Sequence, residues 1–228
     1  MLRPPELADV RKMAYFDAVS DEQARRFAER LSVRSYSSRE SILAEGEPAH
    51  GFFCLRSGKA RIFRMAPDGR EQTFRLVGAG DTFNEVPVFD GGPNPATVEA
   101  LERCEAVLVP TDAFARVIRE HPEVGMVILG HFARRLRSFT ELVEQISLQT
   151  VQGRLARYLY QLAREEGAST PDGIVVPRAI TQQDLASLLG SVREVVSRTL
   201  KVMEEDGIVE VRRKDILIRD LKALNQLL

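Results

Sequence analysis

The chain has 228 residues, of which 44% are hydrophobic and 29% charged, and its formal net charge is −1. This is the composition of an ordinary globular protein, and it excludes disordered and collagen-like chains. No run of about 18 apolar residues predicts a transmembrane helix, and the first residues lack the apolar core of a signal peptide. We therefore expect a cytoplasmic protein with one large domain or two small ones.

Metal ligands and catalytic motifs are scarce. The chain has two cysteines, Cys54 and Cys104, and three histidines, and none stands in CxxC or HxxxH spacing. The sequence therefore predicts no zinc site, and one chain with two cysteines cannot supply the four ligands of an iron–sulfur cluster. The motifs GxSxG, HExxH, Walker A and GxGxxG are also missing. We do not expect an enzyme.

The first 112 residues predict helix followed by antiparallel β-structure. Apolar residues recur through residues 6–31, and Ser20 stands where a helix N-cap is expected. Over residues 33–112, short β-like runs are separated by Gly, Pro and Asp at 8–12-residue spacing, which is typical of a sandwich or a roll. Within them, Pro67-Asp68-Gly69 predicts a tight turn.

Residues 113–150 predict a long helix, with Pro122 in a first helical turn. Six apolar residues recur along it at alternating spacings of three and four, the a/d pattern of a coiled coil. The pattern could pack on the chain's own domain or join two parallel copies, and its narrow width favours a homodimer. Arginines such as Arg135 are expected to cover the rest of the helix. We call the six residues the seam: Leu129, Phe132, Leu136, Phe139, Val143 and Ile146.

Residues 151–228 predict three helices and a β-hairpin. Two short helices, over 181–189 and 191–205, are joined at Gly190 and together predict a helix-turn-helix. Thr181 and Ser191 each begin a pattern that resembles a capping box.

The second of these helices has two contrasting sides. Arginine on such a polar side could bind guanine O6 and N7 in the major groove, and glutamate could accept from cytosine N4. An ordinary solvated surface, with Glu194 and Arg198 as an i,i+4 pair, is the alternative. At 100° per residue the polar side holds Arg193, Glu194, Ser197, Arg198 and Lys201, and the apolar side holds Val195, Val196, Leu200 and Met203.

Over roughly residues 14–222 the chain resembles the CRP/FNR family of bacterial transcription regulators. SVREVVSRTLKVMEEDGIV is similar to the family's recognition helix, and SGKARIF and GAGDTFNE resemble the glycine landmarks of its cyclic-nucleotide-type β-roll. The resemblance implies an α+β fold: an N-terminal antiparallel β-roll of the double-stranded β-helix or jelly-roll type, a long dimerisation helix and a C-terminal winged helix-turn-helix. The domains it implies are residues 1–112, 113–150 and 151–228.

The resemblance also assigns roles to residues. Arg193, Glu194 and Arg198 align with the three family residues that read bases, which implies an inverted repeat with TGTGA-like half-sites. A homodimer, RNA polymerase as a partner and allosteric control are further implications. The alternative is an effector-binding module whose C-terminal domain contacts protein rather than DNA. Backbone or secondary DNA contacts are expected from Thr181, Gln182, Ser191, Ser197 and Lys201.

The expected effector pocket departs from that of cyclic-AMP-binding members. Those members have Gly-Glu-Leu followed by Arg-Ser-Ala, whereas this chain has Asn84-Glu85-Val86 and Asn94-Pro95-Ala96. Glu85 is kept, but the phosphate-binding arginine is replaced by Asn94, and a neutral amide cannot supply its charge-assisted hydrogen bonds. The adenine-contacting threonine aligns with Phe139, beside Thr140. We therefore expect an effector other than cyclic AMP.

A haem-based gas sensor of the same family is a second alternative, which we do not favour. We expect Cys54 to be a small buried hydrophobic residue. An FNR-type iron–sulfur cluster is excluded by the cysteine count. The effector or cofactor stays unknown at this stage. The candidate axial ligands for a haem are His50, His121, His131, Cys54 and Cys104.

Overall fold

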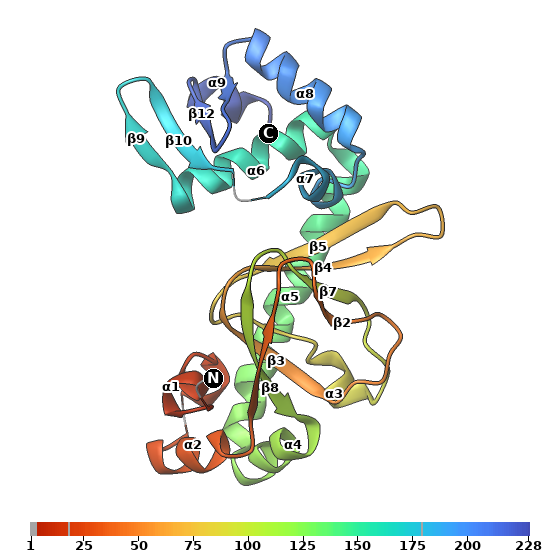
Figure 1. The fold of residues 1–228 in the computed structure, drawn as a ribbon, viewed down its shortest axis with the longest axis vertical. Helices are drawn as coiled ribbons and strands as arrows, with labels where there is room; N and C mark the ends of the chain where they lie inside the picture. Colours follow the sequence, from red (N-terminus) through yellow and green to blue (C-terminus); the bar gives the residue numbers. More distant parts are fainter. Residues whose placement is uncertain (1–3, 18, 179) are drawn as a thin grey trace. The chain divides into compact units, whose positions relative to one another are not determined.

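The computed structural model describes residues 4–17, 19–178 and 180–228. They divide into two compact units. Figure 1 shows the fold, with its colours following the sequence from the N-terminus to the C-terminus. The first unit comprises Met1–Arg64 and Phe74–Phe139, and the second comprises Met65–Thr73 and Thr140–Leu228. No helix within the described residues is long and apolar enough to cross a membrane.

The first unit is built on two antiparallel four-stranded sheets, which confirms the predicted β-roll. Their strand orders are β1-β8-β3-β6 and β2-β7-β4-β5. A short helix, α3 (Val86–Asp90), follows β6. The strands are β1 Ser32–Tyr36, β2 Ser41–Leu43, β3 Gly51–Ser57, β4 Ala60–Met65, β5 Glu71–Val77, β6 Thr82–Phe83, β7 Thr97–Ala100 and β8 Cys104–Pro110.

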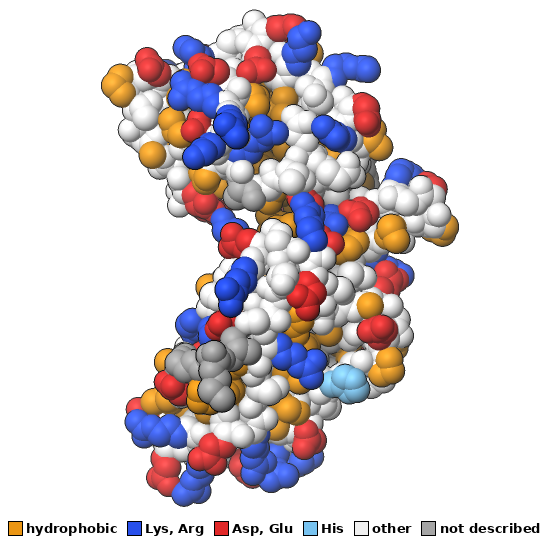
Figure 2. All heavy atoms as spheres, in the orientation of Figure 1, with side chains coloured by type: hydrophobic (Ala, Val, Ile, Leu, Met, Phe, Trp, Pro, Cys, Tyr) orange, Lys and Arg blue, Asp and Glu red, His pale blue; other side chains and the backbone are white. Residues whose placement is uncertain are grey.

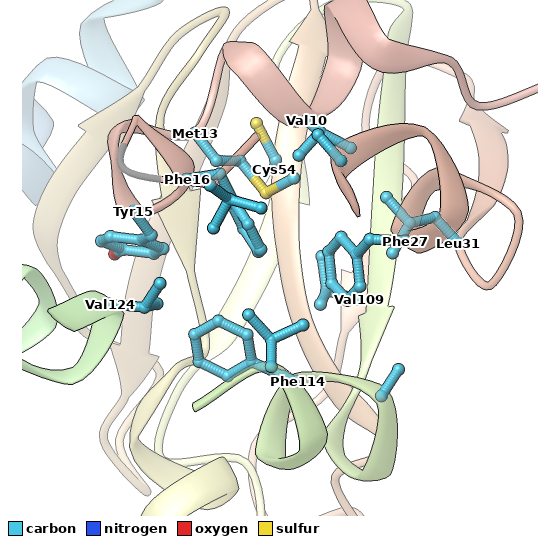
Figure 3. Packing of buried hydrophobic residues seen from close by; sticks show 14 of the residues in the cluster. Val10, Met13, Tyr15, Phe16, Phe27, Leu31, Cys54, Val109, Phe114 and Val124 are labelled. Atoms are coloured by element: carbon cyan, nitrogen blue, oxygen red, sulfur yellow. The ribbon is translucent and has the colours of Figure 1, made fainter. Parts of the chain in front are cut away.

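Helices cover the outer face of the first sheet, and an apolar core lies between them and the strands (Figure 3). Alternate residues of β3 and β8, such as Phe52, Cys54 and Val109, point into this core because side chains alternate along a strand. Figure 3 shows Phe114 and Val124 approaching them from the helical side. The helices are α1 Leu7–Arg11, the 3₁₀ helix η1 Ala14–Phe16, α2 Asp21–Ala28, α4 Thr111–Glu120 and the start of α5 Pro122–Leu148.

The single helical region predicted over residues 6–31 is divided into three short helices. Its apolar residues Val10, Met13, Phe16 and Val19 recur every three residues and are all buried. A spacing of three matches the 3₁₀ helix rather than 3.6 residues per turn, which explains the interruption. The N-cap prediction at Ser20 is confirmed, since its hydroxyl accepts from the Gln23 N–H at 3.4 Å.

A buried ion pair attaches α1 to the roll. The Arg56 guanidinium donates from Nε to Asp9 Oδ1 at 2.9 Å and from Nη2 to Asp9 Oδ2 at 2.7 Å. Asp9 is 1% exposed and Arg56 is 7% exposed. This bidentate geometry offsets the cost of removing both charges from water.

The region predicted as one helix over residues 113–150 is two helices, α4 and α5, that meet at His121. His121 has φ −134° and ψ 76°, which lies outside the helical region. A residue before proline is kept out of that region by contact with the proline ring. Pro122 then begins α5, as predicted.

The second unit contains the end of α5, the four helices that follow it and the sheet β11-β12-β10-β9. The predicted helices and β-hairpin are present. In addition, the segment GASTPDG contributes β9 and the turn to β10, which the sequence analysis did not predict. Apolar side chains of the helices and strands form one core. The elements are α6 Val151–Glu166, β9 Ala168–Thr170, β10 Gly173–Pro177, α7 Gln182–Leu188, α8 Arg193–Glu205, β11 Val209–Val211, β12 Asp215–Ile218 and α9 Leu221–Gln226.

Candidate DNA-reading helix and effector pocket

Helices α7 and α8 are joined by a turn that the backbone itself holds. Gly190 has φ +61°, its N–H donates to Ser187 O at 3.3 Å, and the Ser191 N–H donates to Ala186 O at 2.9 Å. These two bonds form a Schellman motif, which requires a left-handed residue and favours glycine there. The predicted helix-turn-helix is therefore present.

The two predicted capping boxes have different outcomes. The box at Thr181 is confirmed, because its hydroxyl accepts from the Asp184 N–H at 3.1 Å. The box at Ser191 is wrong: the N-cap of α8 is Val192, with no side-chain cap bond. Ser191 already serves the preceding turn through its N–H and lies one residue too early to cap α8.

Helix α8 is divided into a buried and an exposed side. Val196 and Met203 are 0% exposed and Leu200 is 4% exposed, which confirms the apolar side at these positions. Val195 is an exception, because 36% of its surface remains exposed at the flank of the helix. All five residues of the predicted polar side are exposed: Arg193, Glu194, Ser197, Arg198 and Lys201.

The charged residues of this exposed side are available to a partner. Arg193, Glu194 and Arg198 form no ion pair with any of the described residues, so the alternative Glu194–Arg198 pair is not made. Lys201 Nζ lies 3.7 Å from Glu205 Oε1. Figure 2 shows basic and acidic side chains together on the surface over α8.

The residues expected near the DNA backbone lie at the start of α7, in the turn and on α8. Thr181 is exposed, but its hydroxyl is engaged with Asp184 Oδ2 at 2.7 Å. Gln182 and Ser191 are half-buried, and Ser197 and Lys201 are exposed on α8. The basic tip between β11 and β12 adds Arg213 and Lys214, both exposed.

Helix α5 carries two apolar stripes rather than the single one predicted. Val124 and Ile128 are at most 1% exposed and pack into the core of the roll, where Phe132 joins them half-buried. Phe132 also meets Phe89 of α3 edge to face, with the ring centres 5.5 Å apart. The other seam residues remain exposed in this single chain: Leu129 60%, Leu136 68%, Phe139 50%, Val143 63% and Ile146 40%.

The two asparagines of the expected phosphate site bind each other and the backbone. Asn84 Nδ2 donates to Asn94 Oδ1 at 2.9 Å and to Gly51 O at 3.1 Å. Asn94 Nδ2 donates to Ala44 O at 3.1 Å, and only 2% of Asn94 is exposed. Asn94 is thus a satisfied core residue that holds the loop between β2 and β3.

Glu85 points toward α5 instead of toward these asparagines. Arg135 Nη1 donates to Glu85 Oε2 at 2.5 Å, and the Tyr15 hydroxyl donates to Glu85 Oε1 at 2.9 Å. Burial raises the pKa of Glu85, but the Arg135 charge and hydrogen bonds from Arg135 and Thr82 outweigh it, so the net pKa shift is downward. Glu85 is therefore an internal carboxylate, 1% exposed, with its own cation.

A second arginine, Arg75, lies beside Glu85 and Arg135. Arg75 Nη2 and Arg135 Nη2 both donate to the Thr82 carbonyl oxygen at 2.5 Å. Tyr15 OH and Thr82 Oγ1 are 2.7 Å apart, and burial, followed by the charge of Glu85, raises the pKa of Tyr15. We call this group the arginine cluster: Tyr15, Arg75, Thr82, Glu85 and Arg135.

Sequence reasoning missed most of the arginine cluster. It placed Arg135 on the solvated part of α5, which is wrong, because the Arg135 side chain is only 20% exposed. A signal was present: Arg135 follows Val124, Ile128 and Phe132 at spacings of four, four and three, on the side that faces the roll.

The remaining residues of the expected pocket do not join Glu85 and Asn94. Phe139 meets the ring of Phe74 edge to face, with centres 6.3 Å apart. Thr140 is exposed and belongs to the second unit.

The candidate haem ligands have other surroundings. Cys54 and Cys104 are buried, and burial raises the pKa of the Cys54 thiol to about 12, which disfavours the thiolate that would bind iron. The ring of His131 stands edge to face with Tyr15, the centres 5.2 Å apart. His121 Nδ1 lies 3.1 Å from Glu123. Among the described residues no group of three or more His, Cys, Asp or Glu could hold a metal ion.

Comparison with known proteins assigns families to both units. The cyclic nucleotide-binding domain family matches residues 33–121, and the Crp-like helix-turn-helix domain family matches residues 153–227. A CRP-like cAMP-activated global transcriptional regulator of Mycobacterium tuberculosis is 31% identical and covers 92% of this chain and 93% of its own. A cAMP-activated global transcriptional regulator of Salmonella typhimurium is 28% identical and covers 84% of this chain and 91% of its own.

The fold also matches solved structures. The c-di-GMP responsive global regulator CLP of Xanthomonas campestris superposes with a TM-score of 0.78 at 24% identity, over 88% of this chain and 100% of its own. This likeness confirms the order of β-roll, long helix and winged helix-turn-helix.

Proposed function

Because this chain belongs to the CRP/FNR family, we propose that it is a homodimer that reads an inverted DNA repeat and responds to an effector other than cyclic AMP. That it is a DNA-binding transcription regulator with an effector-binding domain, and not an enzyme, follows from the family. The observation that carries the finer proposal is the exposed side of α8, whose arginines and glutamate lack ion-pair partners among the described residues.

Three residues of α8 are proposed to read bases. Arg193 and Arg198 each present a guanidinium that can bind guanine O6 and N7 with two hydrogen bonds, and Glu194 can accept from cytosine N4. Lys201, Ser197 and the start of α7 would contact the sugar–phosphate backbone, which positions the helix without specifying sequence. TGTGA-like half-sites are the expected target.

In-vitro selection from random duplexes tests DNA reading directly. The expected product is an inverted repeat with TGTGA-like halves, whose complex in a gel shift weakens steeply as salt rises because phosphate contacts release counterions. If selection enriches no sequence, and if any protein–DNA complex in the gel shift is insensitive to salt, the result would instead support a C-terminal domain that contacts protein.

Dimerisation is proposed along the exposed part of the seam. A stripe of exposed apolar side chains at a/d spacing on a helix of 27 residues fits a second copy of the same helix. Two recognition helices in a dimer must lie about 34 Å apart to enter successive major grooves. A ligand that binds one arrangement of the two copies better than another would then control DNA binding.

Cyclic AMP is not the proposed effector, although the named relatives from Mycobacterium tuberculosis and Salmonella typhimurium are cAMP-activated. Asn94 offers no charge, and its amide is already bound to Ala44 and Asn84. A cyclic phosphate placed there would be buried without a cation, which is costly. Calorimetry with cyclic AMP is expected to give no binding at micromolar concentrations, and a micromolar or tighter constant would refute this part of the proposal.

A further inference from the structure

Two valines of α8 leave apolar surface in water beside the residues proposed to read bases. Val195, Arg198 and Val202 follow one another at spacings of three and four, so they lie in one row along the same side of the helix. Val195 is 36% exposed and Val202 is 41% exposed. The charged residue between them, Arg198, forms no ion pair with any of the described residues. We call Val195 and Val202 the valine row.

The valine row is poorly suited to contact phosphates. The hydroxyl of Thr199, on the same side of α8, donates to Val195 O at 2.9 Å and is therefore used inside the helix. The other edge of the exposed side carries Ser197 and Lys201, which are exposed and can bind the sugar–phosphate backbone. A valine side chain can gain only from an apolar neighbour, and the apolar group that the major groove displays is the C5-methyl of thymine.

The two valines differ in their place along the helix. Val195 is the third residue of α8, and the first residues of a recognition helix are those that contact base edges. Val202 is seven residues further, which corresponds to about 10 Å at the rise of an α-helix. Val195 therefore lies at the end of α8 that reads bases, and Val202 provides a matched residue away from that end.

We propose that Val195 contacts the C5-methyl group of a thymine within about two base pairs of the guanine that Arg198 reads. Side chains three residues apart on a helix have Cβ atoms about 5–6 Å apart, and successive bases of a strand are about 3.4 Å apart, which sets this distance. In a TGTGA-like half-site every guanine has a thymine in that range on one strand or the other. The inference deepens the proposed function, on which it rests, by adding a specificity-determining residue.

Deoxyuridine tests this contact one methyl group at a time. It keeps the O4 acceptor and the base pairing of thymidine but lacks the C5-methyl. Each thymine of the selected half-site is replaced in turn, in both halves of the repeat, and the affinity is measured by fluorescence anisotropy. We expect one position to weaken wild-type binding about threefold to fivefold per half-site, the value for one buried methyl-sized group. Thymines outside the half-sites are the control positions.

The matched variants are Val195→Ala and Val202→Ala. Alanine is the stronger helix former, so neither change should unfold α8. Val195→Ala should bind the thymidine and deoxyuridine duplexes equally well at the sensitive position, whereas Val202→Ala should keep the wild-type ratio of the two affinities. If Val195→Ala keeps the wild-type ratio, another residue contacts the methyl group and the proposal is wrong.

Salt provides an independent readout. Because a methyl contact releases no counterion, the ratio of the thymidine and deoxyuridine affinities should be the same at low and high salt, while both affinities fall. A ratio that disappears at high salt would overturn the proposal, and so would a selected site whose wild-type affinity is unchanged at every deoxyuridine position. Either result would leave the proposed function intact. Failure to select any DNA site would instead refute the proposed function, and this inference with it.

Discussion

The exposed side of α8 and the arginine cluster differ in how their residues are brought together. On α8, Arg193, Glu194 and Arg198 share a face because they lie within two turns of one helix. In the cluster, Tyr15, Glu85 and Arg135 come from segments 50 or more residues apart, and they bind one another. The first surface is formed by the local periodicity of one helix, whereas the second is formed by the folded chain around an internal charge.

Disrupting the seam would test whether the protein is a dimer that presents two copies of α8. Val143→Glu places two carboxylates face to face in an apolar interface, and should raise the dimer dissociation constant by roughly a hundredfold or more. Val143 is 63% exposed in the single chain, so the fold should be spared. Sedimentation velocity measures the outcome, with Glu144→Gln as the control.

Phe132→Glu is a less selective change, because Phe132 also packs on the roll. A Val143→Glu protein that remains a dimer at low micromolar concentration would place the dimer interface outside the seam.

Removing the cation of the cluster would show how strongly it stabilises the first unit. Arg135→Met leaves the buried Glu85 carboxylate without its cation, and should lower the free energy of unfolding by about 3–5 kcal/mol. The double variant with Glu85→Gln should recover much of that loss, because the buried carboxylate that lost its cation is then removed as well. Urea unfolding at neutral pH measures both, and an unchanged single variant would contradict the ion pair.

Base reading by α8 is expected to have a smaller effect, confined to DNA affinity. Arg198→Ala should reduce the free energy of DNA binding by about 1–3 kcal/mol per half-site. It should also relax the base preference at one position of the half-site. Lys201→Ala should weaken binding to all DNA sequences alike. It should also reduce the slope of log affinity against log salt concentration by about 1 per contact. Repeated site selection with each variant separates the two, and an unchanged motif for Arg198→Ala would exclude it as a base reader.

Restoring the missing phosphate cation should give only partial cyclic AMP binding. Asn94→Arg supplies the charge, but it removes the bonds from Asn94 to Ala44 and Asn84 that hold the loop. We expect the variant to bind cyclic AMP with a dissociation constant weaker than about 1 μM. The free energy of binding would then be smaller in magnitude than about 8 kcal/mol. Calorimetry on both proteins decides this, and tight binding by the variant would show that Asn94 alone excludes the nucleotide.

The smallest expected effect is a pH dependence. The pKa of Glu85 is lower in the folded protein than in the unfolded chain, so its contribution to stability is complete above the pKa of an ordinary glutamate, about 4.3. As pH falls through the folded-state pKa, that contribution is lost. Wild-type stability should therefore fall more steeply than that of Glu85→Gln between about pH 5 and 3. If the stabilities of the two proteins fall equally steeply over this pH range, the lowered pKa of Glu85 is contradicted.

Local patterns predicted much of the fold and of α8. The N-cap at Ser20, the start of α5 at Pro122 and the turn at Gly190 are all properties of a few neighbouring residues, and all are confirmed. Val195 and Ser191 were misassigned because helix periodicity alone does not show where a helix begins or how its flank packs. The family resemblance identified the architecture, which spacing alone left between a sandwich and a roll.

Tertiary pairings were beyond the reach of such patterns. Nothing in the local sequence connects Arg75 or Arg135 with Glu85, because the contacts depend on β5, α3 and α5 meeting in the fold. The exposed β9 strand was missed because its polar residues show no alternation of buried and exposed positions. The functional roles assigned to Arg193, Glu194 and Arg198 stay predictions until DNA is tested.

The buried pair of Asp9 and Arg56 has a consequence for how the protein is produced. A polypeptide begun at Met13 would contain every strand of the roll but would lack Asp9, leaving the 7% exposed Arg56 without that carboxylate. Arg56 would still lie 3.5 Å from Glu105 Oε2, but it would lose the two shorter hydrogen bonds of the buried pair, which stabilise its charge in the core. Expression vectors and gene annotations that choose the downstream methionine would therefore yield a protein prone to aggregation or proteolysis, even though both recognised domains are encoded in full.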